Sequence, residues 1–70
     1  MNDRQEWWLP VLVPKRIEQE LVVRKEEIKR ELLSRLKSAG LRADTEPMWL
    51  DIESDGLFVG GGWRCWAVAQ

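Results

Sequence analysis

Apolar residues recur with the period of an α-helix in the middle third of the chain. On a helical wheel of about 100° per residue, they form one stripe about 60° wide and a second, narrower line beside it. The stripe holds Ile17, Leu21, Ile28, Leu32 and Ala39, extended by Leu36, and the second line holds Val22 and Leu33. Pro14 suits the first position of a helix, and Gly40 suits the left-handed residue that ends one. The pattern therefore predicts a helix over residues 15–40.

The C-terminal third changes to a period of two, which is typical of half-buried β-strands. In residues 48–53, an aliphatic set alternates with a set of one Trp and two acids: Met48, Leu50 and Ile52 against Trp49, Asp51 and Glu53. In residues 63–69, a smaller set alternates with a more polar one: Trp63, Cys65, Ala67 and Ala69 against Arg64, Trp66 and Val68. Residues 54–56 predict a turn between the strands. We expect a hairpin or meander over residues 46–69 whose less polar sets face the helix, with Trp49, Arg64 and Trp66 together on the outside.

Two other segments leave alternatives open. Residues 1–14 form an apolar arm or an edge strand, because Pro10 cannot donate to the interior of a sheet. Residues 60–62 are three consecutive glycines, which predict either a break or bulge with positive φ or a place where a backbone passes closely.

These elements predict a single α+β domain in which one long amphipathic helix packs on a small antiparallel sheet. A helix of twenty-five residues spans roughly 37 Å, whereas a compact chain of 70 residues is about 28 Å across. The helix would overhang its own sheet, so we expect a homodimer formed along the second apolar line. The residues expected at that interface are Val22, Lys29, Leu33 and Leu36.

Charge divides the chain into a basic helix and an acidic sheet, although the net charge is only −1. Residues 15–42 hold nine Lys or Arg against five Glu, and residues 43–70 hold one Arg against five acids. The basic helix allows a dimeric nucleic-acid-binding regulator as an alternative function. Glutamates interleave with its cations and the sequence pI is about 5.4. Both observations favour a solvent-exposed helix face with ion pairs over a phosphate-binding face.

The residue types exclude most catalytic and metal-binding chemistry. The chain has no His and a single cysteine, Cys65, so an intrachain disulfide and every His-based site are excluded. The run Asp51–Gly56 resembles the first half of a calcium loop, but Gly62 stands where the bidentate Glu would be needed. We expect no enzyme activity, no metal and no cofactor. The missing disulfide, the polar N-terminus and the lack of a membrane-spanning apolar run suggest the cytoplasm.

Five tryptophans in 70 residues are the most informative feature. So small a core holds only two or three such side chains, and exposed Trp is typical of protein interfaces. The sequence therefore predicts a non-enzymatic inhibitor or adaptor that occupies a surface of a larger protein. Regulators encoded by phages and other mobile elements often have this size. The residues expected to bind the partner are Trp49, Arg64 and Trp66, with Trp7 and Trp8.

Overall fold

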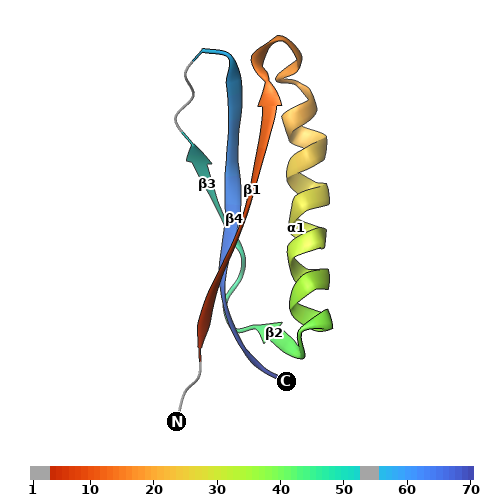
Figure 1. The fold of residues 1–70 in the computed structure, drawn as a ribbon, viewed down its shortest axis with the longest axis vertical. Coiled ribbons are helices and arrows are strands. Elements are labelled where there is room, and N and C mark those ends of the chain that lie inside the picture. The colour runs from red at the N-terminus through yellow and green to blue at the C-terminus, as the bar shows by residue number, and fades with distance from the viewer. Residues whose placement is uncertain (1–3, 53–55) are drawn as a thin grey trace.

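A computed structural model describes residues 4–52 and 56–70, and in this part of the chain one α-helix packs on a four-stranded antiparallel sheet (Figure 1). The elements in chain order are β1 (Gln5–Pro14), a 3-10 turn (Lys15–Ile17), α1 (Glu20–Ser38), β2 (Leu41–Ala43), β3 (Met48–Ile52) and β4 (Phe58–Ala69). The predicted α+β class is confirmed. No helix within the described ranges is long and apolar enough to cross a membrane.

Strand β4 is the centre of the sheet. β1 pairs with it over ten positions, from Gln5 opposite Ala67 to Pro14 opposite Phe58. Two shorter strands share its other side: β2 pairs with residues 67–69 near the C-terminal end of β4, and β3 pairs with residues 60–64. β1 is thus an edge strand, where Pro10 costs no central hydrogen bond.

The helix is shorter than the sequence pattern predicts. Pro14 is extended, with φ −58° and ψ 139°, and ends β1 instead of beginning the helix. At the other end Gly40 takes the expected left-handed conformation, with φ 76°. A helix of 19 residues is about 28 Å long, and the molecule measures 46 by 18 by 16 Å. The helix therefore does not overhang the sheet, and this argument for a dimer is wrong.

The core lies between α1 and one face of the sheet. Leu32 and Leu36 of the helix are the most deeply buried large side chains, and they pack with Leu41, Trp63, Cys65 and Ala67. Of the expected inward set of residues 63–69, Trp63, Cys65 and Ala67 are buried, whereas Ala69 at the end of β4 is exposed. Leu36 belongs to this core, so its expected place in a dimer interface is wrong.

The expected faces of residues 48–52 are reversed. Trp49 pairs with Trp63, which puts it on the helix side of the sheet, and Met48, Leu50 and Ile52 point to the opposite side. Figure 1 shows α1 beside β1, whereas β3 lies on the other side of β4 from both of them. Because the helix packs mainly on β1, β2 and β4, either set of side chains on β3 can stay partly exposed. The alternation in sequence therefore does not reveal which set faces the helix. Glu53, expected beside Trp49, lies outside the described residues.

Residues 60–62 do not break the chain. All three glycines lie inside β4, and the positive-φ glycines among the described residues are Gly40 and Gly56. A Cβ at Gly61 would approach the Trp49 ring to 2.5 Å, and one at Gly62 would approach the Trp8 ring to 2.5 Å. Close approach is thus the correct alternative, with indole rings as well as neighbouring backbone filling the space.

Candidate functional site

The face of the sheet turned away from α1 is lined by apolar side chains. Every second residue of β1, β4 and β3 faces this side, and the paired residues of the three strands form rows across the sheet. The rows are Trp8, Arg64 and Met48, then Pro10, Gly62 and Leu50, then Leu12, Gly60 and Ile52. Phe58 extends this surface at one end and Trp66 at the other. We call the surface formed by these eleven residues the open face, because α1, the one helix of the described residues, packs on the other side.

The open face holds more than half of the exposed large apolar side chains of the described residues. Among the described residues, ten large apolar side chains are exposed, and six of them lie on this face: Trp8, Leu12, Met48, Ile52, Phe58 and Trp66. Leu12 and Met48 each keep more than half of their surface in contact with water. Contiguous apolar patches of this kind mark interaction sites in soluble proteins.

Glycines shape the centre of the open face. The Trp8 ring lies across Gly62, and the side chain of Leu12 lies across Gly60, 2.7 Å from where a Cβ would be. Side chains from β1 therefore cover the middle of β4, whose own residues there have none. The result is a surface of indole and aliphatic groups spread over the strands instead of standing upright from them.

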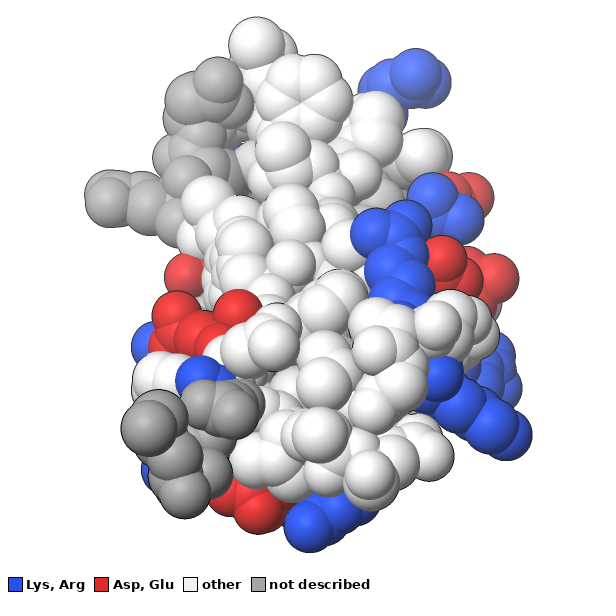
Figure 2. All heavy atoms as spheres, turned by 60° about the horizontal axis from the view of Figure 1, so that its bottom comes forward, with Lys and Arg blue, Asp and Glu red and all other residues white. Residues whose placement is uncertain are grey.

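Two ion pairs lie at the Trp66 end of the open face. Arg64 Nε lies 3.6 Å from Glu6 Oε2, and Arg4 Nε lies 3.2 Å from Asp44 Oδ2. The Arg4 guanidinium also lies 4.9 Å from the ring centre of Trp66, a cation–π contact. Figure 2 shows the charged side chains at the margins of a broad uncharged surface. The cations Arg4 and Arg64 therefore already have acidic partners within the chain.

The tryptophans on the helix side are engaged internally. Trp63 Nε1 donates to the backbone oxygen of Lys25 at 2.6 Å, and Trp49 Nε1 donates to Asp51 Oδ1 at 2.8 Å. The two rings meet edge to face with centres 5.5 Å apart. Lys25 Nζ lies over Trp49 at 4.8 Å, and Lys29 Nζ lies over Trp63 at 5.1 Å. This cluster ties α1 to the sheet.

The structure thus divides the residues expected to bind a partner. Arg64, Trp66 and Trp8 share the open face, whereas Trp49 and Trp7 lie on the helix side. Trp7 is partly buried against the core, and its Nε1 donates to Gln5 Oε1 at 3.3 Å.

Of the six exposed large apolar side chains on the open face, sequence reasoning missed four: Leu12, Met48, Ile52 and Phe58. A signal was present in residues 7–13, where both alternating sets are apolar. Such a strand has apolar side chains on both faces of its sheet, and one helix can cover only one of them.

The residues expected at a helix-mediated dimer interface are also separated. Val22 and Leu33 are exposed on α1, while Lys29 is partly buried over Trp63 and Leu36 is in the core. A dimer interface along the second apolar line would therefore contain only two exposed apolar side chains of the four expected residues, Val22 and Leu33, which are eleven residues apart.

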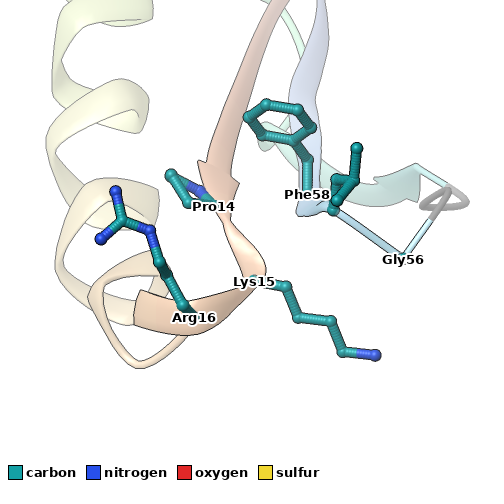
Figure 3. A pocket seen from close by; sticks show the side chains of 6 residues that line it. Pro14, Lys15, Arg16, Gly56 and Phe58 are labelled. Carbon is teal, nitrogen blue, oxygen red and sulfur yellow. The ribbon is translucent and has the colours of Figure 1, made fainter.

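A cavity of about 410 Å³ lies at the end of the molecule where β1 passes into the 3-10 turn (Figure 3). Its lining is Pro14, Lys15, Arg16, Gly56, Leu57 and Phe58. In Figure 3 the Lys15 side chain points away from the ring of Phe58. The cavity adjoins the Phe58 end of the open face, and its wall is mainly apolar.

Cys65 is a core residue. It is buried among Trp63, Ala67 and Leu36, and burial raises the pKa of its thiol. A raised pKa opposes formation of the nucleophilic thiolate. The side chain therefore serves packing.

Comparison with known proteins does not add to this geometry: no family model, no curated protein and no solved structure matches the chain.

Proposed function

We propose that this protein is a non-enzymatic regulator, an inhibitor or adaptor, that occupies a surface of a larger protein through its open face. The observation that carries the proposal is the gathering of six exposed large apolar side chains on one uncovered face of the sheet. Burying such a surface against a partner releases water from apolar area, which is the main driving force of protein association.

The composition of the open face supports this function. Trp8 and Trp66 combine a large apolar area with an indole N–H, and Arg64 lies between them along the sheet. Trp and Arg surrounded by smaller apolar contacts are the usual centre of a protein-binding hot spot. The paired charges at one end then form part of a polar rim.

The alternative function, a dimeric nucleic-acid-binding regulator, has less support. The outward face of α1 carries ion pairs within one helical turn, Arg24 with Glu27 at 3.6 Å and Arg35 with Glu31 at 3.0 Å. A phosphate would have to compete with these carboxylates and would meet their repulsion.

The proposal is tested by photocrosslinking from defined positions. A benzophenone amino acid replaces Leu12 or Met48 on the open face, and replaces Val23, an exposed residue of α1, as the matched control. In a lysate of the source cells, treated with nuclease, we expect crosslinks to one protein from positions 12 and 48 and none from 23. Crosslinks from position 23 alone, or capture that nuclease removes, would contradict the proposal.

The captured protein is then purified and its affinity measured by calorimetry. Trp66→Ala should weaken binding by about thirtyfold, the typical effect of removing a hot-spot anchor. Val23→Ala should leave the affinity unchanged, because this side chain lies on α1, away from the open face.

A further inference from the structure

The open face is also the best surface of this chain for binding to itself. We infer that in the free protein the open face is covered by the open face of a second copy, so that two sheets pack face to face about a two-fold axis. The dimer itself does not depend on the proposed function. Its consequence does: if the partner binds to the same face, then the dimer must dissociate before the partner binds.

The area of the open face is close to what a specific dimer interface needs. Ten paired positions of β1 and β4 span about 34 Å and two strands span about 10 Å, while the five paired positions of β3 add a strip of about 17 by 5 Å. The flat area is thus about 410 Å² per copy, or about 820 Å² for two copies. Accessible area exceeds flat area for protruding side chains such as Leu12 and Met48, which brings the total toward the roughly 1,000 Å² expected of a specific interface.

The charges on the open face are compatible with a second copy. An isologous contact presents the same patch twice, so any unpaired charge would meet its own kind or be buried alone. The cations Arg64 and Arg4 already have the carboxylates of Glu6 and Asp44 beside them. The apolar remainder can therefore be buried without leaving either of these cations unpaired.

The two other routes to a dimer have less support. Edge-to-edge pairing through β1 would meet Pro10, which has no N–H to donate and is a common protection of edge strands. Pairing through α1 would bury Val22 and Leu33 but not Leu36, which is in the core. Face-to-face packing buries the largest number of exposed apolar side chains.

Sedimentation equilibrium of the full chain between about 5 and 200 µM tests this inference, because a specific dimer is populated by mass action over such a range. Leu12→Glu changes the open face, and Leu33→Glu makes the same change on α1, where Leu33 is also exposed. We expect wild type and Leu33→Glu to sediment at twice 8.2 kDa and Leu12→Glu to sediment as a monomer. Circular dichroism confirms that each variant is folded.

Two results would overturn the inference: a wild-type monomer throughout the range, or loss of the dimer in Leu33→Glu. A second measurement needs no variant. In a mixture of isotope-labelled and unlabelled wild type, filtered NOE spectra should show contacts between copies from Leu12, Met48 and Phe58, and contacts from Val22 and Leu33 instead would also overturn it. Because these experiments use the protein alone, their failure is distinct from a failure to find a larger partner.

Discussion

Gly61 and Gly62 are neighbours in β4 but face opposite sides of the sheet. Gly61 lies on the helix side, where a Cβ would meet the carbonyl oxygen of Leu50 and the ring of Trp49. Gly62 lies on the open face, where the three nearest atoms all belong to the ring of Trp8. The first contact includes backbone that is held by the sheet, and the second involves only a partly exposed side chain.

This difference predicts unequal costs for the same substitution. Gly61→Ala should lower the free energy of unfolding by about 2–3 kcal/mol, the cost of overpacking a rigid site. Gly62→Ala should lower it by less than about 1 kcal/mol, because Trp8 can turn toward solvent. Urea unfolding of both variants at low protein concentration measures the difference. Equal losses would show that the Trp8 ring is as fixed as the sheet backbone.

The two tryptophans of β4 make a second matched pair. Trp63 is 8% exposed and donates to the backbone oxygen of Lys25, whereas Trp66 is 38% exposed on the open face. We expect Trp63→Ala to destabilise the protein by about 3–5 kcal/mol and Trp66→Ala by about 1 kcal/mol or less. Thermal unfolding of the two variants at the same low protein concentration, where association through the open face does not contribute, checks this. A larger loss for Trp66→Ala would mean that the core lies on the other face.

At the scale of the element, α1 has one side in the core and one side in solvent. Its buried residues Leu32 and Leu36 lie toward the C-terminal end, over the sheet, while Val22 and Leu33 face solvent. The two apolar lines seen in the sequence therefore differ in burial: the stripe that holds Leu32 and Leu36 reaches the core, and the line of Val22 and Leu33 does not. Ion pairs such as Arg35 with Glu31 lie on the exposed side, and surface pairs of this kind contribute little.

Truncating one leucine from each environment should separate them. Leu36→Ala should cost about 2–5 kcal/mol, since it leaves a cavity against the sheet, and Leu33→Ala should cost less than about 1 kcal/mol. Urea denaturation monitored by circular dichroism at 222 nm gives both values. If Leu33→Ala were as costly as Leu36→Ala, then α1 would be packed along both lines, as an interface through the helix requires.

At the scale of the whole molecule, one face of the sheet has a helix and the other does not. A chain of 70 residues buries only roughly 60% of its unfolded surface. With a single helix to cover it, the sheet keeps large side chains such as Trp8, Leu12 and Phe58 in water. The association that we infer with a second copy, or propose with a partner, would bury the surface that the chain alone leaves open.

This arrangement predicts that thermal stability depends on protein concentration. If folded chains associate through the open face, then mass action stabilises the folded state, and the Tm of the wild type should rise by several degrees between about 5 and 200 µM. The Tm of Leu12→Glu should not change over the same range. Scanning calorimetry at several concentrations measures both, and a wild-type Tm that is independent of concentration would contradict association.

Much of the architecture could be predicted from local patterns. The helical period around Leu32 and the alternation in residues 63–69 indicate the helix and the inward residues of β4, and Pro10 limits residues 1–14 to an arm or an edge strand. Each of these inferences depends on residues that are close in sequence, since side-chain direction follows from the backbone conformation of the element itself. Trp66 and Arg64 were placed on the outer face for the same reason.

The remaining features depend on contacts between distant segments. Trp49 belongs with Trp63 because β3 pairs with β4 in that register, and a shift by one residue would have reversed every side chain of β3. Residues 60–62 continue the strand because Trp8 and Trp49 lie against them from either side. The open face arises because the helix is as wide as about two strands and covers one side of the sheet only. Local periodicity therefore indicated the helix and the strands of the C-terminal third, whereas strand register and helix placement, which follow from packing across the chain, decided which side chains remain exposed on the open face.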